Sequence, residues 1–415
     1  MANHKHDFLW GASSCAYQTD GADNTQWADW EMKHAEKLAR IDHKRFGWVQ
    51  GHAKFVHEAT QPANYVCGDG IRHREFYKED LKLLKDMGLN AFRFSVEWAR
   101  IEPSRDHYDE NEIAFIKKYI REIKACGLTP IITLWHWTMP TWFTDIGAFE
   151  KRANVKYFVH YCRRVLQELD GEVKWILTVN EPMVYAHASY LIGGWPPSKR
   201  SIFKLLTVGN NLAIAHRQVY KLAKRIDPKS KVSISHNTSY IHAGDSKLLT
   251  MFWVALNRWE RDSFFLNRAH KHMDFLGLNW YTSDTYIGTK LRNPNRPVSD
   301  LGWDMRPHDI AFSLNYLWRT YHLPILITEN GCADAADSRR EWWIEETLKA
   351  LRGSRNNGVE LLGYCHWSAF DNFEWDKGFW PRFGLIAVNH RTMQRTPRPS
   401  AKFYAKCAKD KHFMQ

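Results

Sequence analysis

Residues 175–182, WILTVNEP, and residues 325–331, ILITENG, share one pattern. Each stretch is a short run of apolar and β-branched residues that leads directly into an asparagine and a glutamate. Such a run is typical of a strand buried in a parallel sheet. Because the carboxyl ends of the strands in a parallel barrel lie at one mouth, polar residues at those ends are expected to meet. The two stretches therefore predict a parallel sheet that carries two carboxylates at one end.

Runs of the same kind recur along the chain, separated by amphipathic helical segments. The predicted strands are residues 8–11, 91–95, 130–134, 175–179, 232–235, 275–278, 325–328 and 361–367. The predicted helices include residues 74–87, 111–126, 154–169, 203–226 and 340–356. Eight such units without a Pro-rich or Ser-rich linker predict an α/β fold in which residues 1–415 form a single (β/α)8 TIM barrel, one catalytic domain. Residues 24–69 and 292–307 interrupt the pattern, and we expect them to be long loops on the rim of a pocket.

The composition is that of a globular protein with a large core, at 44% hydrophobic and 25% charged residues. The 20 tryptophans exceed what core packing normally requires, and flat indole faces suit the apolar C–H faces of a pyranose ring. The formal net charge is +12, but the basic residues are spread along the chain without a nucleic-acid-binding motif. We therefore expect a solvated basic surface and no nucleic-acid partner.

The cysteines and the N-terminal sequence allow a prediction of the cellular compartment. The seven cysteines are odd in number and form no CxxC pair, so we expect free thiols in a reducing compartment. The N-terminal MANHKHDFLWG lacks the pattern of a signal peptide, and no run of about 18 apolar residues occurs. These features predict a cytoplasmic protein without a membrane partner. The histidines have no metal-site spacing, so we expect no metal and no cofactor.

A polar or aromatic residue follows each predicted strand, which core packing would not require. These residues are Gln18, Arg93, His136, Asn180 with Glu181, Asn237, Tyr281, Glu329, and Trp367 leading to Glu374 and Trp375. Glu181 and Glu329 follow the fourth and seventh strands, on different sides of the predicted barrel. Cleavage of a glycosidic bond needs one carboxylic acid and one carboxylate flanking the anomeric carbon, and this pair could provide them. The alternative for each glutamate is a cap on the helix that follows its strand.

Motifs along nearly the whole chain resemble those of glycoside hydrolase family 1, the β-glucosidase and β-galactosidase family. They are FLWGASSCAYQTDGA, FRFSVEWARIEP, TLWHWTMPTW, TVNEP, GLNWYTS, ITENG, GYCHWSAFDNFEW and RFGLIAVNHRTMQRTPRPSAKFY. The resemblance implies that Glu181 is the acid/base and Glu329 the nucleophile of a retaining β-glycosidase. It implies that Arg93 and Tyr281 hold the nucleophile. The sugar-binding residues that it implies are Gln18, His136, Asn180, Glu374 and Trp375, with Trp367 beneath the sugar ring.

The implied substrate is a small neutral β-glycoside: a β-glucoside, and also a β-galactoside or β-fucoside. A carboxylate at Glu374 would accept hydrogen bonds from the 4- and 6-hydroxyls of the sugar and would repel a 6-phosphate. Lys377, nearby in the sequence, keeps a 6-phospho-β-glycosidase open as an alternative. Two more functions stay open, a sugar-binding barrel without catalysis and a transglycosidase. The sequence predicts no oligomeric state.

The chain also departs from the family pattern. Asp20 stands where the family usually has glutamate, and Trp280 where a tyrosine is common. The segment between residues 232 and 278 is shorter than usual, which predicts a trimmed rim and a more open aglycone region. Phe379 and Trp380 either offer aromatic surface to the leaving group or form an ordinary buried pair.

Overall fold

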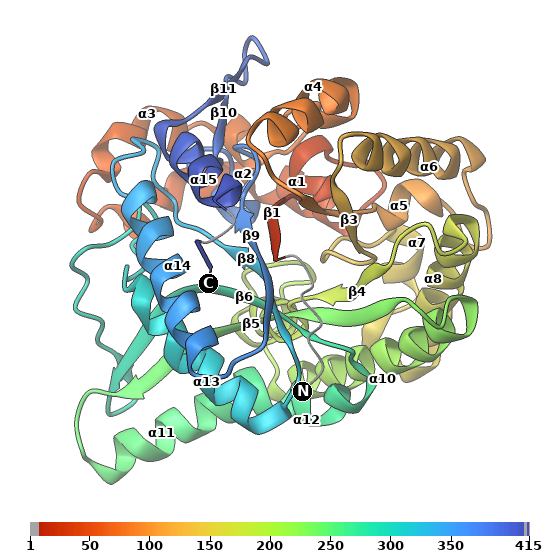
Figure 1. The fold of residues 1–415 in the computed structure, drawn as a ribbon. Helices are drawn as coiled ribbons and strands as arrows, with labels where there is room; N and C mark the ends of the chain where they lie inside the picture. The colour runs from red at the N-terminus through yellow and green to blue at the C-terminus, as the bar shows by residue number, and fades with distance from the viewer. Residues whose placement is uncertain (1–7, 411–412, 415) are drawn as a thin grey trace.

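The computed structural model describes residues 8–410 and 413–414. Eight parallel strands close into a barrel at the centre of the molecule, and helices surround it (Figure 1). The barrel strands are β1 (Leu9–Ser13), β2 (Ala91–Ser95), β3 (Thr129–Thr133), β4 (Trp175–Asn180), β5 (Lys231–Ala243), β6 (Leu276–Ile287), β8 (Ile325–Asn330) and β9 (Leu361–Trp367). Neighbouring strands pair in this order, β5 pairs with β6, and β9 pairs with β1 to close the ring. The predicted (β/α)8 barrel is confirmed.

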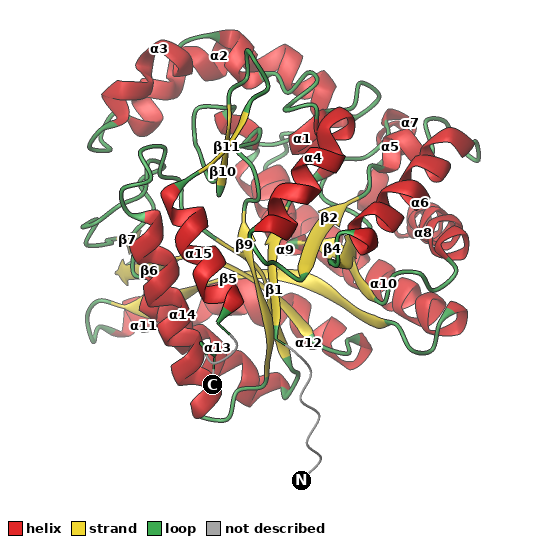
Figure 2. Cartoon of the chain, turned by 45° about the horizontal axis from the view of Figure 1, so that its top comes forward, coloured by secondary structure: helices red, strands yellow, loops and turns green. Residues whose placement is uncertain are grey.

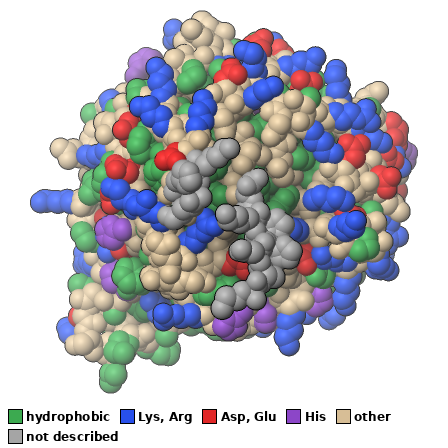
Figure 3. Space-filling model, in the orientation of Figure 1, with side chains coloured by type: hydrophobic (Ala, Val, Ile, Leu, Met, Phe, Trp, Pro, Cys, Tyr) green, Lys and Arg blue, Asp and Glu red, His purple; other side chains and the backbone are tan. Residues whose placement is uncertain are grey.

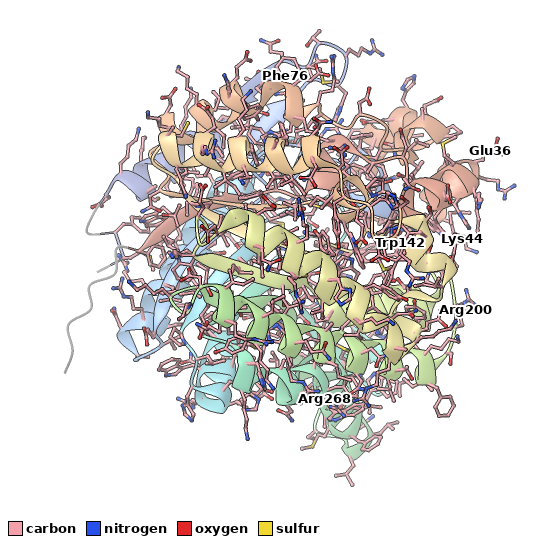
Figure 4. The ribbon with its side chains drawn as sticks, turned by 90° about the vertical axis from the view of Figure 1, so that its right-hand side faces the viewer. Glu36, Lys44, Phe76, Trp142, Arg200 and Arg268 are labelled. Carbon is pink, nitrogen blue, oxygen red and sulfur yellow. The ribbon has the colours of Figure 1, made fainter. Side chains whose placement is uncertain are left out.

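Helices fill the connections between successive strands and cover the barrel from outside (Figure 2). They are α1 (Ala16–Asp20), α2 (Gln26–Phe46), α3 (Val56–Ala59), α4 (His73–Asp86), α5 (Trp98–Ile101), α6 (Glu110–Ala125), α7 (Thr141–Asp145), α8 (Val155–Leu169), α9 (Pro182–Ala186), α10 (Ile202–Ile226), α11 (Leu248–Arg258), α12 (Phe264–Ala269), α13 (Ile310–Tyr321), α14 (Arg340–Asn356) and α15 (Pro399–Lys409). A short hairpin of β10 (Ile386–Val388) and β11 (Arg395–Pro397) follows the barrel. Exposed charged side chains such as Glu36, Lys44, Arg200 and Arg268 lie at the periphery (Figure 4).

The two ends of the barrel differ in chemistry. A compact apolar cluster of buried side chains packs inside the barrel: Ala91, Ile131, Leu177, Phe275, Leu326 and Cys365. Several of these residues precede the polar strand-end residues by only two to four positions, as Ala91 precedes Arg93 and Leu177 precedes Glu181. A rigid apolar layer therefore supports the polar end of the barrel, where catalysis occurs in this fold.

The stretch after β1 was predicted to be a loop, and that prediction is wrong because α2 occupies 21 residues of it. The Thr25 side chain caps this helix by accepting a hydrogen bond from the backbone N–H of Ala28 at 3.1 Å. Its buried face includes the acidic residues Glu31 and Asp42. These two buried carboxylates interrupt the helical repeat of apolar residues, and for this reason the sequence pattern did not predict a helix here.

The region between residues 232 and 278 contains elements that extend outward from the barrel, and the more open aglycone region expected there stays a prediction. β5 and β6 extend beyond the barrel, and their pairing continues to Ala243 opposite Tyr286. Helix α11 follows β5, and a short strand, β7 (Lys290–Leu291), folds back along β6. Together these elements form a projection beside the barrel mouth, visible at the lower left of Figure 1.

Candidate active site

Glu329 lies near the end of β8 and is almost fully buried, at 3% exposure. Its Oε1 accepts a short hydrogen bond from the guanidinium of Arg93, and its Oε2 accepts one of 2.6 Å from the hydroxyl of Tyr281. Burial, and next the charge of Glu329, raise the pKa of Tyr281 far above its usual range, so this hydroxyl keeps its proton and donates it. One cation and one hydroxyl thus stabilise a negative charge on Glu329.

The backbone after Glu329 explains the glycine of the ENG sequence. Gly331 lies so close to β9 that a Cβ atom there would approach the carbonyl oxygen of Trp367 to 1.8 Å. Only glycine fits this contact, because a side-chain carbon would overlap the backbone of the neighbouring strand. The glycine therefore allows the ends of β8 and β9 to approach each other, which brings Trp367 beside the Glu329 strand.

Glu181 follows β4 and has a left-handed backbone conformation, with φ of 42°. Its Oε1 accepts hydrogen bonds from the side-chain amides of Asn279 at 2.8 Å and Asn237 at 3.1 Å. Burial, and next the negative charge of Glu329, raise the pKa of Glu181 to about 8. Its two neutral donors offset this rise only in part, so Glu181 is held as the protonated acid at neutral pH.

The two glutamates line one cavity of about 380 Å³. Glu329 receives hydrogen bonds from a cation and a hydroxyl, whereas Glu181 receives them from two neutral amides. Glu329 therefore contacts a cation that would stabilise a negative charge, whereas both donors to Glu181 are neutral. A pair of carboxyl groups whose environments separate their protonation states can serve as nucleophile and general acid.

His136 and Gln18 line the same cavity, and each has one buried polar atom without a hydrogen-bond partner in the described part of the protein. Nε2 of His136 accepts a hydrogen bond of 3.0 Å from the amide of Asn180, and burial lowers the pKa of His136 well below its usual value. The ring is therefore neutral, with its proton on Nδ1. Within the described part of the protein, buried Nδ1 of His136 and Oε1 of Gln18 make no hydrogen bond. A donor and an acceptor are thus left for a ligand, as a sugar hydroxyl requires.

Aromatic rings and Glu374 form another part of the cavity lining. Trp367 and Trp375 each lie about 6 Å from the ring of His136, centroid to centroid. Trp375 is stacked on Tyr17 at 5.7 Å with an interplanar angle of 4°, so its orientation is fixed from behind. Burial raises the pKa of Glu374 to about 7, and the nearby Lys377 opposes this rise. Rigid indole faces beside polar atoms are a common arrangement in sugar sites.

The predicted site residues fall into two sets. Those that line the cavity are Gln18, His136, Glu181, Tyr281, Glu329, Trp367, Glu374 and Trp375. Arg93 and Asn180 are fully buried and are not part of the lining. Arg93 donates to Glu329 and, at 2.7 Å, to Oδ1 of Asn180. Both residues therefore lie behind the cavity lining and position the lining residues to which they are hydrogen-bonded.

Sequence reasoning missed several residues of the site. Asn279, which donates to Glu181, was not singled out, although it lies two positions before Tyr281 on the same strand. Strand residues two apart face the same side, and that relation could have identified it. Arg261, in the helical segment before α12, and Asp284, on β6, line the cavity as an ion pair of 3.0 Å. No sequence motif connects these two residues.

Phe379 and Trp380 do not line this cavity. Trp380 is completely buried against Phe46 and Phe55, and Phe379 packs on Phe373. The hypothesis of a leaving-group surface is therefore wrong, whereas packing in the interior fits at least Trp380. The cavity lining instead includes Val184, Trp195, Leu291, Trp303 and Phe383.

The two departures from the family pattern are also outside the lining. Asp20 accepts a hydrogen bond of 2.8 Å from the backbone N–H of Arg74 in the first turn of α4. Trp280 is fully buried and donates to Ser313 at 3.2 Å. Both residues therefore connect structural elements and do not touch the cavity.

Comparison with known proteins identifies the family. The model of glycosyl hydrolase family 1 matches residues 1–260 and 260–413. The chain belongs to this family. As a member of glycosyl hydrolase family 1 the protein is a glycoside hydrolase, and at the level of the family a retaining β-glycosidase. Its chain is 26% identical to Beta-glucosidase A of Acetivibrio thermocellus, with 98% of each chain covered.

Two further comparisons agree with this family 1 assignment. The Beta-galactosidase of Sulfolobus acidocaldarius is 28% identical, over 86% of this chain and 87% of the relative. The solved structure of a beta-glycosidase from Pyrococcus horikoshii superposes with a TM-score of 0.84 at 29% identity, covering 98% of this chain and 95% of that one. These relatives carry both glucosidase and galactosidase titles, so membership of the family leaves the preferred sugar open.

No metal site accompanies the family 1 cavity in residues 8–410 and 413–414, where no group of three or more His, Cys, Asp or Glu side chains is arranged to hold an ion. All seven cysteines lie in this part of the chain and are free thiols. In the same part, no helix is long and apolar enough to cross a membrane.

Proposed function

We propose that the protein hydrolyses small neutral β-glycosides by double displacement, with Glu329 as nucleophile and Glu181 as acid/base. The observation that carries this proposal is the contrast between the two carboxyl groups. Arg93 and Tyr281 stabilise a charge on Glu329, while burial keeps a proton on Glu181. The substrates that we propose are β-glucosides, together with β-galactosides and β-fucosides.

In the first step Glu329 attacks the anomeric carbon and Glu181 gives its proton to the departing glycosidic oxygen. The bond from Glu329 to the sugar forms as the bond to the aglycone breaks, which leaves a covalent glycosyl-enzyme and an ionised Glu181. Esterification removes the charge of Glu329, and the pKa of Glu181 then falls because one of its two main raising causes is gone. Glu181 next takes a proton from water, and this water attacks the anomeric carbon and releases Glu329.

Two inversions at the anomeric carbon retain the β configuration. This mechanism requires the two carboxyl groups to stand about 5–5.5 Å apart when substrate is bound. Nδ1 of His136 and Oε1 of Gln18 are the groups that we propose for the sugar hydroxyls, and Trp367 for the ring face.

The basic side chains in the cavity lining already form ion pairs with carboxylates, and this supports a neutral sugar as substrate over a phosphorylated one. Lys377 donates to Asp376 at 2.8 Å, and Arg261 is paired with Asp284. Glu374, in the same lining, would repel a phosphate whenever it is ionised. A 6-phosphate would therefore have to break an existing ion pair to gain a cation.

The test is turnover of 4-nitrophenyl β-glucoside, β-galactoside, β-fucoside, β-mannoside and 6-phospho-β-glucoside by the wild type and by Glu329→Gln. Glu102→Gln is the matched control, because Glu102 is a buried glutamate outside the cavity. We expect wild type and Glu102→Gln to release 4-nitrophenol from a neutral glycoside and Glu329→Gln to be inactive. Preference for the phosphorylated glucoside would overturn the proposal of a neutral substrate. No turnover of any of the five glycosides, together with retained sugar binding, would mean that the barrel binds sugars without cleaving them. Product analysis at high acceptor concentration separates hydrolysis from transglycosylation.

A further inference from the structure

Helix α11 presents an apolar face to solvent. Its sequence is LLTMFWVALNR, and only Thr250 and Val254 are buried. Leu248 is 84% exposed, Phe252 67% and Leu256 40%, and these three residues recur at intervals of four, so they form one stripe. A helix on the surface of a water-soluble domain normally turns charged and polar residues outward. An outward apolar stripe therefore indicates a surface that is covered when the protein acts.

The β6–β7 hairpin beside this helix continues the apolar surface. Thr250 accepts a hydrogen bond of 2.8 Å from the backbone N–H of Gly288, which joins α11 to the turn between β6 and β7. Ile287 and Leu291, on either side of this turn, are 45% and 51% exposed. We call Leu248, Phe252, Leu256, Ile287 and Leu291 the apolar shelf. Hydrophobic side chains gather on the projection at the lower left of Figure 3, where Figure 1 places α11.

The apolar shelf begins at the catalytic cavity. Leu291 belongs both to the shelf and to the cavity lining that contains Glu181 and Glu329. Arg261 and Asp284 join the two strands of the projection to the same lining, because Arg261 also donates to Ser239 of β5 at 2.6 Å. An aglycone that leaves the cavity on this side would pass directly onto apolar surface.

Basic residues border the shelf. Residues 287–296, IGTKLRNPNR, contain three basic residues and no acidic one, and Lys290, Arg292 and Arg296 are all exposed. Helix α11 itself contains one arginine and no acidic residue. Apolar and aromatic side chains next to exposed lysine and arginine are the composition of an element that lies in the headgroup region of an anionic bilayer. A symmetric contact with a second copy would instead bring equally charged borders together.

We propose that the apolar shelf docks on the surface of an anionic lipid bilayer and that the cavity beside it takes β-glycosides whose aglycone is a lipid. The substrate part of this proposal rests on the proposed function, whereas the docking does not. The contact is interfacial. The expectation of no membrane partner was based on the lack of a spanning segment, which does not bear on a helix lying in the headgroup region.

Flotation of the full chain with vesicles tests the docking without any use of catalysis. We expect the wild type to float with vesicles of equimolar phosphatidylcholine and phosphatidylglycerol, to bind vesicles of phosphatidylcholine alone more weakly, and to be released by salt. The double variant Leu248→Gln/Phe252→Gln should bind the mixed vesicles about tenfold or more weakly, since it removes two exposed apolar side chains. The matched control is Met32→Gln/Phe203→Gln, which changes residues 69% and 80% exposed on other helices.

Both double variants should turn over a soluble aryl glycoside like the wild type, because none of the four residues lines the cavity. The docking is overturned if wild type does not float with the mixed vesicles, or if the shelf variant floats as well as the control variant. It is also overturned if the lipid-free chain is a dimer that the shelf variant converts to a monomer. Normal flotation without turnover of any neutral glycoside would reject the proposed function, and with it the lipid-glycoside substrate, while the docking would stand.

Discussion

The side-chain amide of Asn279 donates a hydrogen bond of 2.8 Å to Oε1 of Glu181. The orientation of this amide is fixed because its oxygen accepts a hydrogen bond of 2.6 Å from the hydroxyl of Thr328 on the next strand. The same amide nitrogen lies 3.2 Å from Oδ1 of Asn180, which Arg93 also holds. Asn279 therefore connects the surroundings of Glu181 with the guanidinium that binds Glu329.

We expect Asn279→Ala to shift the pH dependence of kcat/KM upward on its alkaline side. The acid form of Glu181 is required, so in the wild type kcat/KM should fall as the pH rises through the pKa of about 8. The Asn279 hydrogen bond lowers this pKa, and its loss should raise it. Measurement of kcat/KM against pH with an aryl glycoside checks the shift.

Asn237→Ala is the matched comparison, since Asn237 donates to the same oxygen at 3.1 Å. Its longer hydrogen bond should give a smaller shift in the same direction. A downward shift of the alkaline limb in both variants would contradict the assignment of Glu181 as the acid.

Replacement of the nucleophile should abolish turnover without loss of the fold. Glu329→Gln cannot form the glycosyl-enzyme, so we expect kcat to fall by about 10⁴-fold or more. The neutral amide also removes the charge that contributes to the raised pKa of Glu181, so this pKa should fall, although burial still keeps it above its ordinary value. Turnover with an aryl glycoside and titration of Glu181 by carbon NMR measure the two effects. Wild-type turnover in this variant would exclude Glu329 as the nucleophile.

The barrel strands could be predicted closely where burial alone determines the sequence pattern. The predicted ranges 91–95 and 361–367 coincide with β2 and β9, because both strands are buried along nearly their whole length. Strand β5 was predicted over four residues but extends to Ala243, since its outer part leaves the barrel and loses the continuous apolar pattern. Helix α11 was not predicted, because an apolar helix without a polar face resembles a buried segment.

The site residues that could be predicted from the sequence are those at or shortly after the ends of the predicted strands. Eight of the ten predicted site residues line one cavity, because the barrel brings every strand end to one mouth. The sequence could not distinguish the lining from the layer behind it, so Arg93 and Asn180 were placed with the others. Pairs formed by tertiary packing, such as Arg261 with Asp284, depend on how a helical segment packs against a strand, which no local pattern encodes.

A buried carboxyl away from the cavity gives a stability prediction. Glu31 on α2 accepts hydrogen bonds from the backbone N–H of Cys67 at 3.0 Å and from the hydroxyl of Tyr17. Burial raises its pKa from 4.5 to about 8, so the folded state holds this proton more tightly than the unfolded chain. Its contribution to stability is fully present below pH 4.5 and is lost as the pH rises to about 8.

Glu31→Gln should therefore weaken the pH dependence of unfolding between pH 4.5 and about 8. The free energy of unfolding from urea titrations at several pH values measures it. Glu75→Gln, on the exposed surface, is the control and should keep the wild-type slope. An unchanged slope in Glu31→Gln would mean that Glu31 titrates alike in the folded and unfolded states.

Removal of the acid/base should reveal the stereochemistry of the reaction. Glu181→Ala cannot protonate a poor leaving group, but 4-nitrophenol departs without a proton, so the glycosyl-enzyme should still form on Glu329 and then accumulate. Azide needs no general base and fits the space left by the carboxyl group, so it should restore turnover and give a β-glycosyl azide. Proton NMR of the product distinguishes the two anomers through the coupling of the anomeric proton. An α-azide would show a single inversion and would exclude the covalent intermediate, whereas a β-azide requires two displacements at one carbon.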